Sequence, residues 1–309
     1  MSLANSSSEH AVFLEREQCV SCGNTDLQVI WQGRFCDEPT RTWMRAMHYS
    51  GDVEHALGDE TFSRVACRTC GMSFHQRILT DNWLATLYSE WISSAQISAY
   101  EGNYQQKTLD AKFIEGTQNI KHLLRLRQLS QKQGRHPLRL LDFGCGDGKF
   151  LRIGAALGFK VFGVDPSISR RARSESAGIP IAASLDELNT GDGYDCVTLF
   201  EVLEHVANPR GILEALRTRM STHAVLVIEV PDCQGIGVPR SFDHFGAIQP
   251  LEHINHFTPS TLSALCRRVG FIPAPRVPAH VTTDLFSIVK TEASRLFRRT
   301  TTSQYFRRV

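Results

Sequence analysis

The chain has 309 residues, of which 42% are apolar and 21% charged, and its formal net charge is +2. This length predicts about two domains, and the near-neutral charge excludes a strongly basic nucleic-acid-binding protein. No apolar run approaches the roughly 20 residues that cross a bilayer. Residues 1–10 are polar and serine-rich, unlike a signal peptide, so we expect a disordered leader and a cytoplasmic protein.

Four of the nine cysteines form two CxxC pairs, and each pair is followed by a glycine. Two residues between cysteines allow one tight turn to direct two sulfurs at the same ion. The pairs therefore predict one structural zinc ion with four ligands, and the alternative is a set of redox dithiols or unrelated thiols. The predicted ligands are Cys19, Cys22, Cys67 and Cys70, whereas Cys36 is expected in the core or a loop.

Residues 1–80 are predicted to form a small zinc-ribbon-like domain. Many zinc ribbons bind nucleic acids, but this segment has seven arginines, no lysine and ten acids. A phosphate-binding surface needs the opposite sign of charge, so we expect a scaffold or a lid on the substrate side. Large apolar side chains between the cysteine pairs are expected to form its core or a substrate wall: Trp31, Phe35, Trp43, Met44 and Tyr49.

Residues 81–135 are predicted to be a helical linker or lid. The apolar spacing from Trp83 to Trp91 is helical, and a long amphipathic helix is expected over residues 107–131. Tyr100 and Tyr104 are candidate lid contacts, or simply half-buried residues.

Residues 136–290 alternate short apolar runs with helical patterns, which is typical of a doubly wound parallel sheet. The first strand ends at Asp142 and is followed by Gly144, Gly146 and Gly148. This spacing lacks the third glycine of a dinucleotide site, and Asp142 and Asp147 would both repel a pyrophosphate. The pattern therefore predicts S-adenosylmethionine, which carries no phosphate; an ordinary glycine turn is the alternative.

The ends of two later strands add polar groups to this predicted site. Asp165 follows the strand over residues 160–164, where a carboxylate accepts hydrogen bonds from both ribose hydroxyls. The strand over residues 194–200 opens into a loop that we expect to border the methionine portion. The predicted cofactor-binding residues are Asp142, Gly144, Cys145, Gly146, Asp165, Pro166, Phe200 and Glu201.

These motifs resemble those of the class I S-adenosylmethionine-dependent methyltransferases, whose first motif reads acid-x-Gly-x-Gly-x-Gly. Residues 201–209 resemble the motif after strand four in small-molecule methyltransferases of the ubiquinone-biosynthesis and sugar-modifying type. The Asn/Asp-Pro-Pro-aromatic motif of enzymes that methylate exocyclic base nitrogens is absent. The resemblance implies an α/β fold with a seven-stranded, doubly wound Rossmann-like sheet.

The whole layout is similar to bacterial zinc-containing methyltransferases, including deoxysugar C-methyltransferases. In those enzymes a histidine after strand four and a Glu-His pair after strand five serve the chemistry. The resemblance implies catalytic roles for His253 as base, Glu252 as orienting or auxiliary group, and His205 as a second polar contact; a structural role for His205 is the alternative. Those enzymes also carry a further C-terminal domain, whereas this chain ends about 20 residues after the last predicted strand.

The remaining elements complete the expected sheet. Residues 271–272 and 285–289 are predicted to be its antiparallel last strands, and residues 291–309 a basic tail. Residues 290–309 have six basic residues and one acid, so the tail is expected to be solvated or to touch an anionic partner or membrane surface.

The sequence as a whole predicts an enzyme that transfers a methyl group from S-adenosylmethionine to a hydroxyl or carbon of a small molecule, with a sugar-linked metabolite favoured. One alternative is a nucleic-acid or protein methyltransferase that uses the zinc domain as a reader. The other is a non-catalytic scaffold, although such a protein has no physical need for the glycine turn and its acids.

Overall fold

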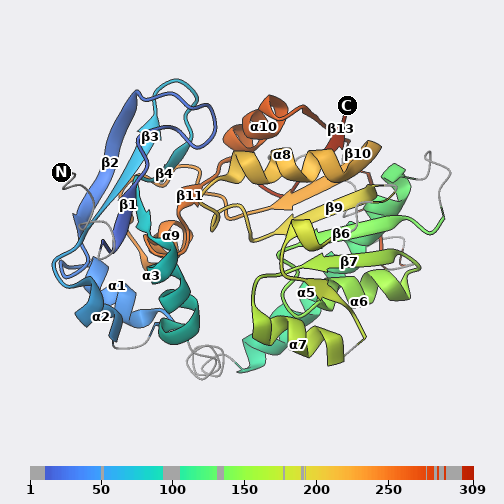
Figure 1. Ribbon diagram of the computed structural model, residues 1–309, viewed down its shortest axis with the longest axis horizontal. Coiled ribbons are helices and arrows are strands. Elements are labelled where there is room, and N and C mark those ends of the chain that lie inside the picture. The colour runs from blue at the N-terminus through green and yellow to red at the C-terminus, as the bar shows by residue number, and fades with distance from the viewer. Residues whose placement is uncertain are drawn as a thin grey trace, which may run out of the picture. The chain divides into compact units, whose positions relative to one another are not determined.

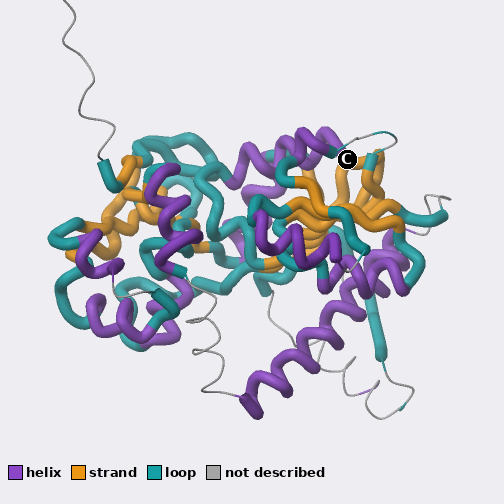
Figure 2. Tube along the Cα trace, turned by 60° about the horizontal axis from the view of Figure 1, so that its bottom comes forward, coloured by secondary structure: helices purple, strands orange, loops and turns teal. Residues whose placement is uncertain are grey.

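The computed structural model divides into two compact units, which are described separately. Unit 1 comprises residues 1–110 and 233–256, and unit 2 comprises residues 111–232 and 257–309. The structure describes residues 11–49, 52–92, 105–130, 136–176, 178–188, 191, 193–275, 277–281, 284, 289 and 301–309, with the backbone alone at 52, 105–113, 169 and 176. Figure 2 draws the other residues in grey.

Unit 2 is built on a mixed seven-stranded sheet in the order β12-β13-β10-β9-β6-β7-β8. Strands β6 to β10 run parallel, and β13 is antiparallel to both of its neighbours. Parallel strands covered on both faces are continuously apolar, and Tyr194–Leu199 of β9 are all buried. The strands are β6 (Arg139–Phe143), β7 (Lys160–Val164), β8 (Ile181–Ala182), β9 (Tyr194–Phe200), β10 (Met220–Glu229), β12 (Phe271–Pro273) and β13 (Gln304–Arg308).

Helices cover both faces of this sheet, with α8 and α10 on one face and α5, α6 and α7 on the other (Figure 1). The long helix α5 agrees with the helix expected over residues 107–131. Thr258 caps α10 with a capping box, and Asn208 caps α8 by accepting a hydrogen bond from the Gly211 amide. The helical elements are α5 (Gln105–Ser130), α6 (Lys149–Ala156), α7 (Ile168–Ser176), η3 (Leu185–Glu187), α8 (Pro209–Arg219) and α10 (Pro259–Arg268).

The end of the predicted basic tail is a strand of the sheet. Strand β13 lies between β10 and β12, the position expected for residues 285–289, of which only 289 is described. Its Tyr305 and Phe306 are buried, with 4% and 0% of their surface exposed. The prediction of a solvated tail is therefore wrong for this segment. Burial of two aromatic side chains stabilises the strand by more free energy than the partial burial of its arginines costs, because an arginine can keep its charged group near solvent.

Unit 1 contains a four-stranded sheet in the order β11-β4-β3-β2 and a two-stranded pairing of β1 with β5. Strand β11 comes from the segment that follows β10 in the sequence, and it pairs with β4 in an antiparallel arrangement. The strands are β1 (Phe13–Glu15), β2 (Leu27–Arg34), β3 (Thr61–Cys67), β4 (Ser73–His75), β5 (Arg77–Leu79) and β11 (Asn255–His256). The helical elements are α1 (Thr40–Ala46), α2 (Asp52–Leu57), α3 (Asp81–Thr86), η1 (Leu87–Trp91) and α9 (Phe242–Ile248).

Two buried arginines join residues 233–256 to the rest of unit 1. Arg16 donates to the backbone oxygen of Ile254 at 2.7 Å and to Asn255 Oδ1 at 2.9 Å. Arg64 donates to the backbone oxygens of Ile236 and Gly237, each at 2.7 Å. Because the acceptors of Arg16 at Ile254 and Asn255 are buried with their donor, removal of this arginine leaves several polar groups unsatisfied.

The large apolar side chains between the cysteine pairs form the core of unit 1. Phe35, Met44 and Tyr49 are buried in one hydrophobic cluster, and Trp31 and Trp43 pack against it. The core alternative for these residues is therefore supported.

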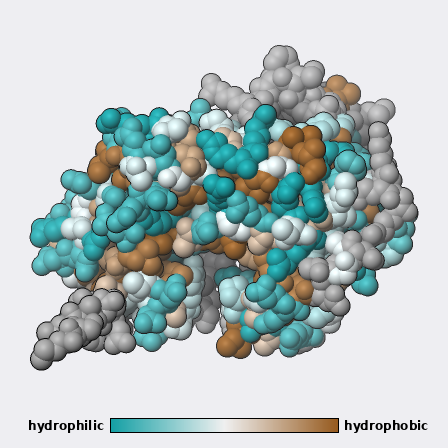
Figure 3. All heavy atoms as spheres, turned by 45° about the horizontal axis from the view of Figure 1, so that its top comes forward, coloured by the Kyte–Doolittle hydropathy of each residue, from teal (hydrophilic) through white to brown (hydrophobic). Residues whose placement is uncertain are grey.

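Tyr100 and Tyr104 lie outside the described residues. Within the described part of the chain, no helix has the length and apolar character needed to cross a membrane. On the face drawn in Figure 3, hydrophobic residues alternate with hydrophilic ones.

Candidate functional site

The four cysteines of the two pairs converge in unit 1. Their sulfur atoms all lie within 4.8 Å of one another. Cys19 Sγ is 3.5 Å from Cys70 Sγ, and Cys22 Sγ is 3.6 Å from Cys67 Sγ. A tetrahedral zinc ion with Zn–S bonds of about 2.3 Å requires sulfurs about 3.8 Å apart. The cluster therefore has the dimensions that a four-cysteine zinc site needs.

The two cysteine turns share one backbone geometry. The Gly23 amide donates to the Cys19 carbonyl, and the Gly71 amide donates to the Cys67 carbonyl, both at 2.8 Å. Both glycines have positive φ, 76° and 74°. A glycine after each pair allows this left-handed turn.

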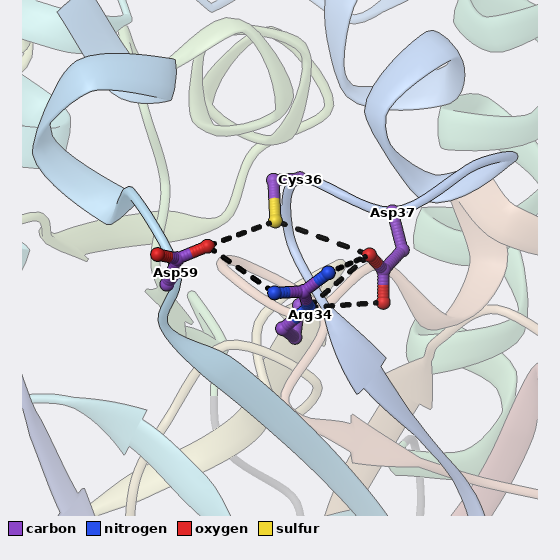
Figure 4. Close-up of polar contacts among 4 residues, drawn as sticks. All are labelled: Arg34, Cys36, Asp37 and Asp59. Atoms are coloured by element: carbon purple, nitrogen blue, oxygen red, sulfur yellow. Dashed lines mark hydrogen bonds and ion pairs between the residues drawn. The ribbon is translucent and has the colours of Figure 1, made fainter.

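Cys36 lies outside the cluster, in a polar surface group (Figure 4). Its Sγ is 3.5 Å from Asp59 Oδ1, and the Arg34 guanidinium pairs with Asp37 at 2.8 Å and with Asp59 at 3.4 Å. Cys36 is therefore a suitable control for experiments on the four cysteines of the cluster.

The Glu-His pair predicted for catalysis lies in unit 1. The Glu252 carboxylate accepts a hydrogen bond from the Tyr49 hydroxyl at 2.5 Å and lies 3.0 Å from His48 Nε2. Burial, opposed by the charge of Glu252, lowers the pKa of His253. Glu252 therefore contacts Tyr49, which was expected in the core or a substrate wall, and His48, which was not predicted. No sequence motif near residue 48 indicates this contact.

In unit 2 the glycine turn joins β6 to α6 with the conformation that its sequence predicts. Gly144, Gly146 and Gly148 have φ values of 79°, 56° and 74°. A Cβ at Gly144 would lie 2.4 Å from Val202 Cγ2, whereas a Cβ at Gly146 would meet no atom within 4 Å. Gly144 is thus required by packing, and Gly146 leaves open space beside the backbone that a ligand can occupy.

Asp142 is the penultimate residue of β6 and carries a buried carboxyl group. Its Oδ1 accepts a hydrogen bond from Thr198 Oγ1 at 2.6 Å, and 4% of the residue is exposed. Burial, together with the charge of Asp165, raises the pKa of Asp142 to about 7. A cation bound next to it would stabilise the ionised form.

Asp165 supports the turn from the end of β7. One carboxylate oxygen accepts the Gly146 amide and the other accepts the Ser167 amide, both at 2.9 Å. Only 3% of the residue is exposed. Asp165 therefore fixes the backbone of the glycine turn, and the predicted contact with ribose hydroxyls would be additional. Pro166, which follows it, is exposed.

The loop after β9 brings carboxyl groups together. Glu201 has a positive φ of 53°, and its amide donates to the Glu229 carbonyl at 2.9 Å. Burial raises the pKa of Glu201, and burial with the charge of Glu201 raises that of Glu204. Within the described residues, neither Glu204 carboxylate oxygen has a hydrogen-bond partner, and His205 Nε2 lies 3.8 Å from Glu204 Oε1.

The glycine turn and the ends of β9 and β10 line one cavity of about 630 Å³ in unit 2. Five predicted cofactor residues lie on its wall: Asp142, Gly144, Cys145, Phe200 and Glu201. The remaining lining residues are Ile114, Glu115, Gln118, Asn119, His122, Asp147, Lys149, Phe150 and Glu229. Gly146 and Asp165 contact each other next to this wall.

Sequence reasoning missed His122 and Glu229 in this cavity. His122 lies on α5 among apolar residues and reads as an ordinary buried position of an amphipathic helix. Glu229 is the last residue of β10, so only its place at the carboxyl end of a parallel strand, where ligands bind, could have indicated it.

Comparison with known proteins gives three kinds of match. A family model described as a methyltransferase domain matches residues 115–272. A ubiquinone biosynthesis O-methyltransferase of Cereibacter sphaeroides (strain ATCC 17025 / ATH 2.4.3) is 31% identical over 170 residues, which cover 48% of this chain and 66% of that protein. The protein of the same name from Rhodopseudomonas palustris (strain HaA2) is 30% identical over 98 residues, which cover 29% of this chain and 39% of that protein. The chain thus spans 39% to 66% of these relatives.

Two solved structures resemble the chain more distantly. An S-adenosylmethionine-dependent methyltransferase from Mesorhizobium loti is 27% identical with a TM-score of 0.37, and the match covers 55% of this chain and 91% of that one. The plantazolicin methyltransferase BpumL in complex with SAH is 15% identical with a TM-score of 0.47, and the match covers 73% and 93% of the two chains.

Proposed function

The chain belongs to the family of methyltransferase domains, and from this premise we propose that it transfers the methyl group of S-adenosylmethionine to a hydroxyl group of a small molecule. The observation that carries this proposal is the cavity beside the glycine turn. The open side of Gly146 admits a ligand close to the backbone, and the wall is rich in carboxylates.

The charge of the cavity supports this choice of cofactor. Asp142, Glu201 and Glu229 line it together with a single lysine, Lys149. A pyrophosphate would be repelled by these carboxylates, whereas S-adenosylmethionine brings a sulfonium and an ammonium group. Bound there, it supplies an electrophilic methyl group; the chain must bind the ligand, orient it and remove a proton from the acceptor.

The acceptor is proposed to be a small-molecule hydroxyl because the relatives are named O-methyltransferases. A sugar-linked metabolite is a narrower form of this proposal, and transfer to carbon is its alternative. The acidic balance of residues 1–80 opposes a nucleic-acid acceptor.

The residues proposed for proton removal are histidines and a carboxylate. A histidine with a pKa near neutrality accepts a proton from an alcohol efficiently. His253 is the proposed base, Glu252 an auxiliary group, and His205 a second polar contact. The contacts of Tyr49 and His48 fix the Glu252 carboxylate, whose charge opposes the lowering of the His253 pKa by burial.

One structural zinc ion is proposed for the four-cysteine cluster in unit 1. The sulfur spacing and the paired turns fit a closed tetrahedral site, in which all four positions are taken by the chain. Such an ion would stabilise unit 1 and would not take part in methyl transfer.

Two measurements test the proposed function. Calorimetry should detect binding of S-adenosylmethionine to the full chain, and Gly146→Ala should abolish it while lowering the free energy of unfolding of unit 2 by only about 1 kcal/mol. Incubation with methyl-labelled cofactor and a metabolite extract should then give a labelled product whose methyl group is attached to oxygen. Failure to bind the cofactor, or a labelled nucleic acid as the product, would refute the proposal.

Variants of the three proposed catalytic residues test the proton-removal step. His253→Ala should lower kcat by about 100-fold or more with the true acceptor, because general base catalysis contributes about 10²–10⁴. His205→Ala and Glu252→Gln should have smaller effects. Full turnover by His253→Ala would exclude it as the base.

A further inference from the structure

The cavity of unit 2 is lined by more acidic than basic residues. Five of its lining residues are acids and one is a lysine. The acids are Glu115, Asp142, Asp147, Glu201 and Glu229. A charged ligand in such a cavity is attracted by the sum of these groups, so its net charge affects its affinity even without a direct contact to each one.

A chain of polar contacts leads from the sheet to one of these acids. Tyr305 of β13 and His122 of α5 meet through the Tyr305 hydroxyl and His122 Nδ1 at 2.6 Å. His122 Nε2 lies 3.5 Å from Glu229 Oε2. The His122 ring also packs between Tyr305 and Phe200, with ring centroids 5.9 Å and 5.1 Å away. The imidazole is therefore held on both of its nitrogen atoms and on its ring faces.

Arg125 Nη1 donates to the Tyr305 hydroxyl oxygen at 3.5 Å, and a guanidinium can only donate. The hydroxyl keeps its own hydrogen, so this contact is compatible with a Tyr305 hydroxyl that donates to His122 Nδ1. A neutral imidazole that accepts at Nδ1 carries its hydrogen on Nε2, so an N–H group faces Glu229. This arrangement holds the Glu229 side chain at the cavity wall.

Glu229 is well placed to act on a ligand beside the glycine turn. Its side chain is 41% exposed, and its backbone oxygen accepts the amide of Glu201. The carboxyl groups at the ends of the neighbouring strands β9 and β10 thus line the same cavity as Asp142, the penultimate residue of β6.

We propose that this cavity distinguishes S-adenosylmethionine from its demethylated product by net charge, with Glu229 as a main determinant and Tyr305 and His122 as positioning residues. The inference rests on the proposed function. In that reaction the acceptor oxygen forms the new C–O bond, the electron pair of the broken C–S bond stays on sulfur, and the hydroxyl proton passes to the proposed base, His253. The ligand that remains has lost its sulfonium charge, so the net charge of the bound ligand falls from +1 to about 0. The acidic wall therefore binds the cofactor in preference to the product and favours product release.

Calorimetric titrations of the full chain with S-adenosylmethionine and with S-adenosylhomocysteine, at one low ionic strength, test this inference. Glu229→Gln should weaken binding of the cofactor about three- to tenfold and binding of the product less than about twofold, because only one ligand has a net positive charge. Tyr305→Phe keeps the ring and removes the hydroxyl, and it should shift the ratio of the two dissociation constants in the same direction by about twofold.

The matched control is Glu214→Gln, which removes an exposed carboxylate on α8 that pairs with Arg210 at 2.8 Å. This variant should leave both affinities unchanged. Equal losses for the two ligands in Glu229→Gln would mean that Glu229 binds a group common to both, and would overturn the inference while the proposed function stands. Unchanged dissociation constants for both ligands in Glu229→Gln would also overturn it. If the wild-type chain binds neither ligand, the inference and the proposed function both fail.

Discussion

The two units stabilise their sheets in different ways. In unit 2 the central strand β9 buries Tyr194–Leu199, so apolar packing on both faces of the sheet carries the structure. In unit 1 no residue of β2 is fully buried, although β3 and β4 bury Phe62, Val65 and Phe74, and the sulfur cluster and two buried arginines add polar contacts to the sheet. The difference indicates that the smaller sheet depends more on a few polar contacts, whose removal should be far more damaging than a typical surface change.

Loss of the proposed zinc ion should produce the largest difference in stability between the two units. Cys67→Ser removes one thiolate ligand, and structural zinc contributes about 10 kcal/mol or more to folding of small domains. We expect unit 1 to become sensitive to protease while unit 2 stays folded, with the bound zinc per chain falling from one to about zero. Limited proteolysis and elemental analysis would measure this. Cys36→Ser should retain the metal, and equal zinc loss in both variants would contradict the assignment.

Two glycines of unit 2 should respond differently to the same substitution. Gly144→Ala places a methyl group 2.4 Å from Val202 Cγ2 at a φ of 79°, so strain and overpacking should destabilise the unit by about 3–4 kcal/mol. Gly146→Ala meets no atom within 4 Å and should destabilise it by about 1 kcal/mol. Urea unfolding of both variants checks the difference, and comparable losses would show that packing does not distinguish these positions.

The arginine contacts of unit 1 provide a third comparison. Arg16→Met leaves buried acceptors on His75, Ile254 and Asn255 without their donor, and should destabilise unit 1 by about 2–3 kcal/mol. Arg45→Met breaks an exposed ion pair with Glu54 and should change stability by less than about 1 kcal/mol. Chemical denaturation followed by tryptophan fluorescence would report on unit 1, which holds Trp31 and Trp43. Similar losses in the two variants would remove the distinction between buried and exposed arginines.

The buried acid of unit 2 should make stability depend on pH. The pKa of Asp142 is about 7 in the folded chain and near 3.8 when unfolded, so the unfolded state loses this proton first and stability falls as the pH rises from about 4 to about 7. Asp142→Asn removes this dependence, and allowing for a weaker contact with Thr198 it should be about 2 kcal/mol more stable than the wild type at pH 8. The difference should disappear near pH 4. Thermal unfolding across this range measures it, and a constant difference would exclude Asp142 as the titrating group.

Cofactor binding should carry the opposite dependence. A cation beside Asp142 favours the ionised carboxylate, so binding below pH 7 should release a proton and should become tighter as the pH rises toward 7. Titrations in buffers of different ionisation enthalpy would detect the released proton, and Asp142→Asn should not release it.

Local patterns in the sequence were sufficient for most of unit 2. The apolar run of residues 194–200 gave the bounds of β9, and the glycine spacing gave the turn, because each is determined by neighbouring residues. The last strand was misplaced. Residues 304–308 are rich in arginine, and only their pairing with β10 and β12 determines that Tyr305 and Phe306 are buried.

The polar network around the candidate sites could not be predicted in the same way. The contact of Glu252 with His48 joins residues 204 positions apart, and that of His122 with Tyr305 joins residues 183 apart. No periodicity or motif encodes such distances. By contrast, the CxxC spacing of the two cysteine pairs predicted that they lie together, although Cys22 and Cys67 are 45 positions apart in the sequence.

The pairing of β11 with β4 has a consequence for how the chain folds. The sheet of unit 1 cannot be completed until residues 255–256 are available, and the strands β6 to β10 lie between its two segments in the sequence. Closing so long a loop is slow, because its entropy is lost before the contacts form. A fragment ending near residue 110 would leave Arg16 and Arg64 without their carbonyl partners and one edge of β4 unpaired, so it should aggregate where the whole chain folds.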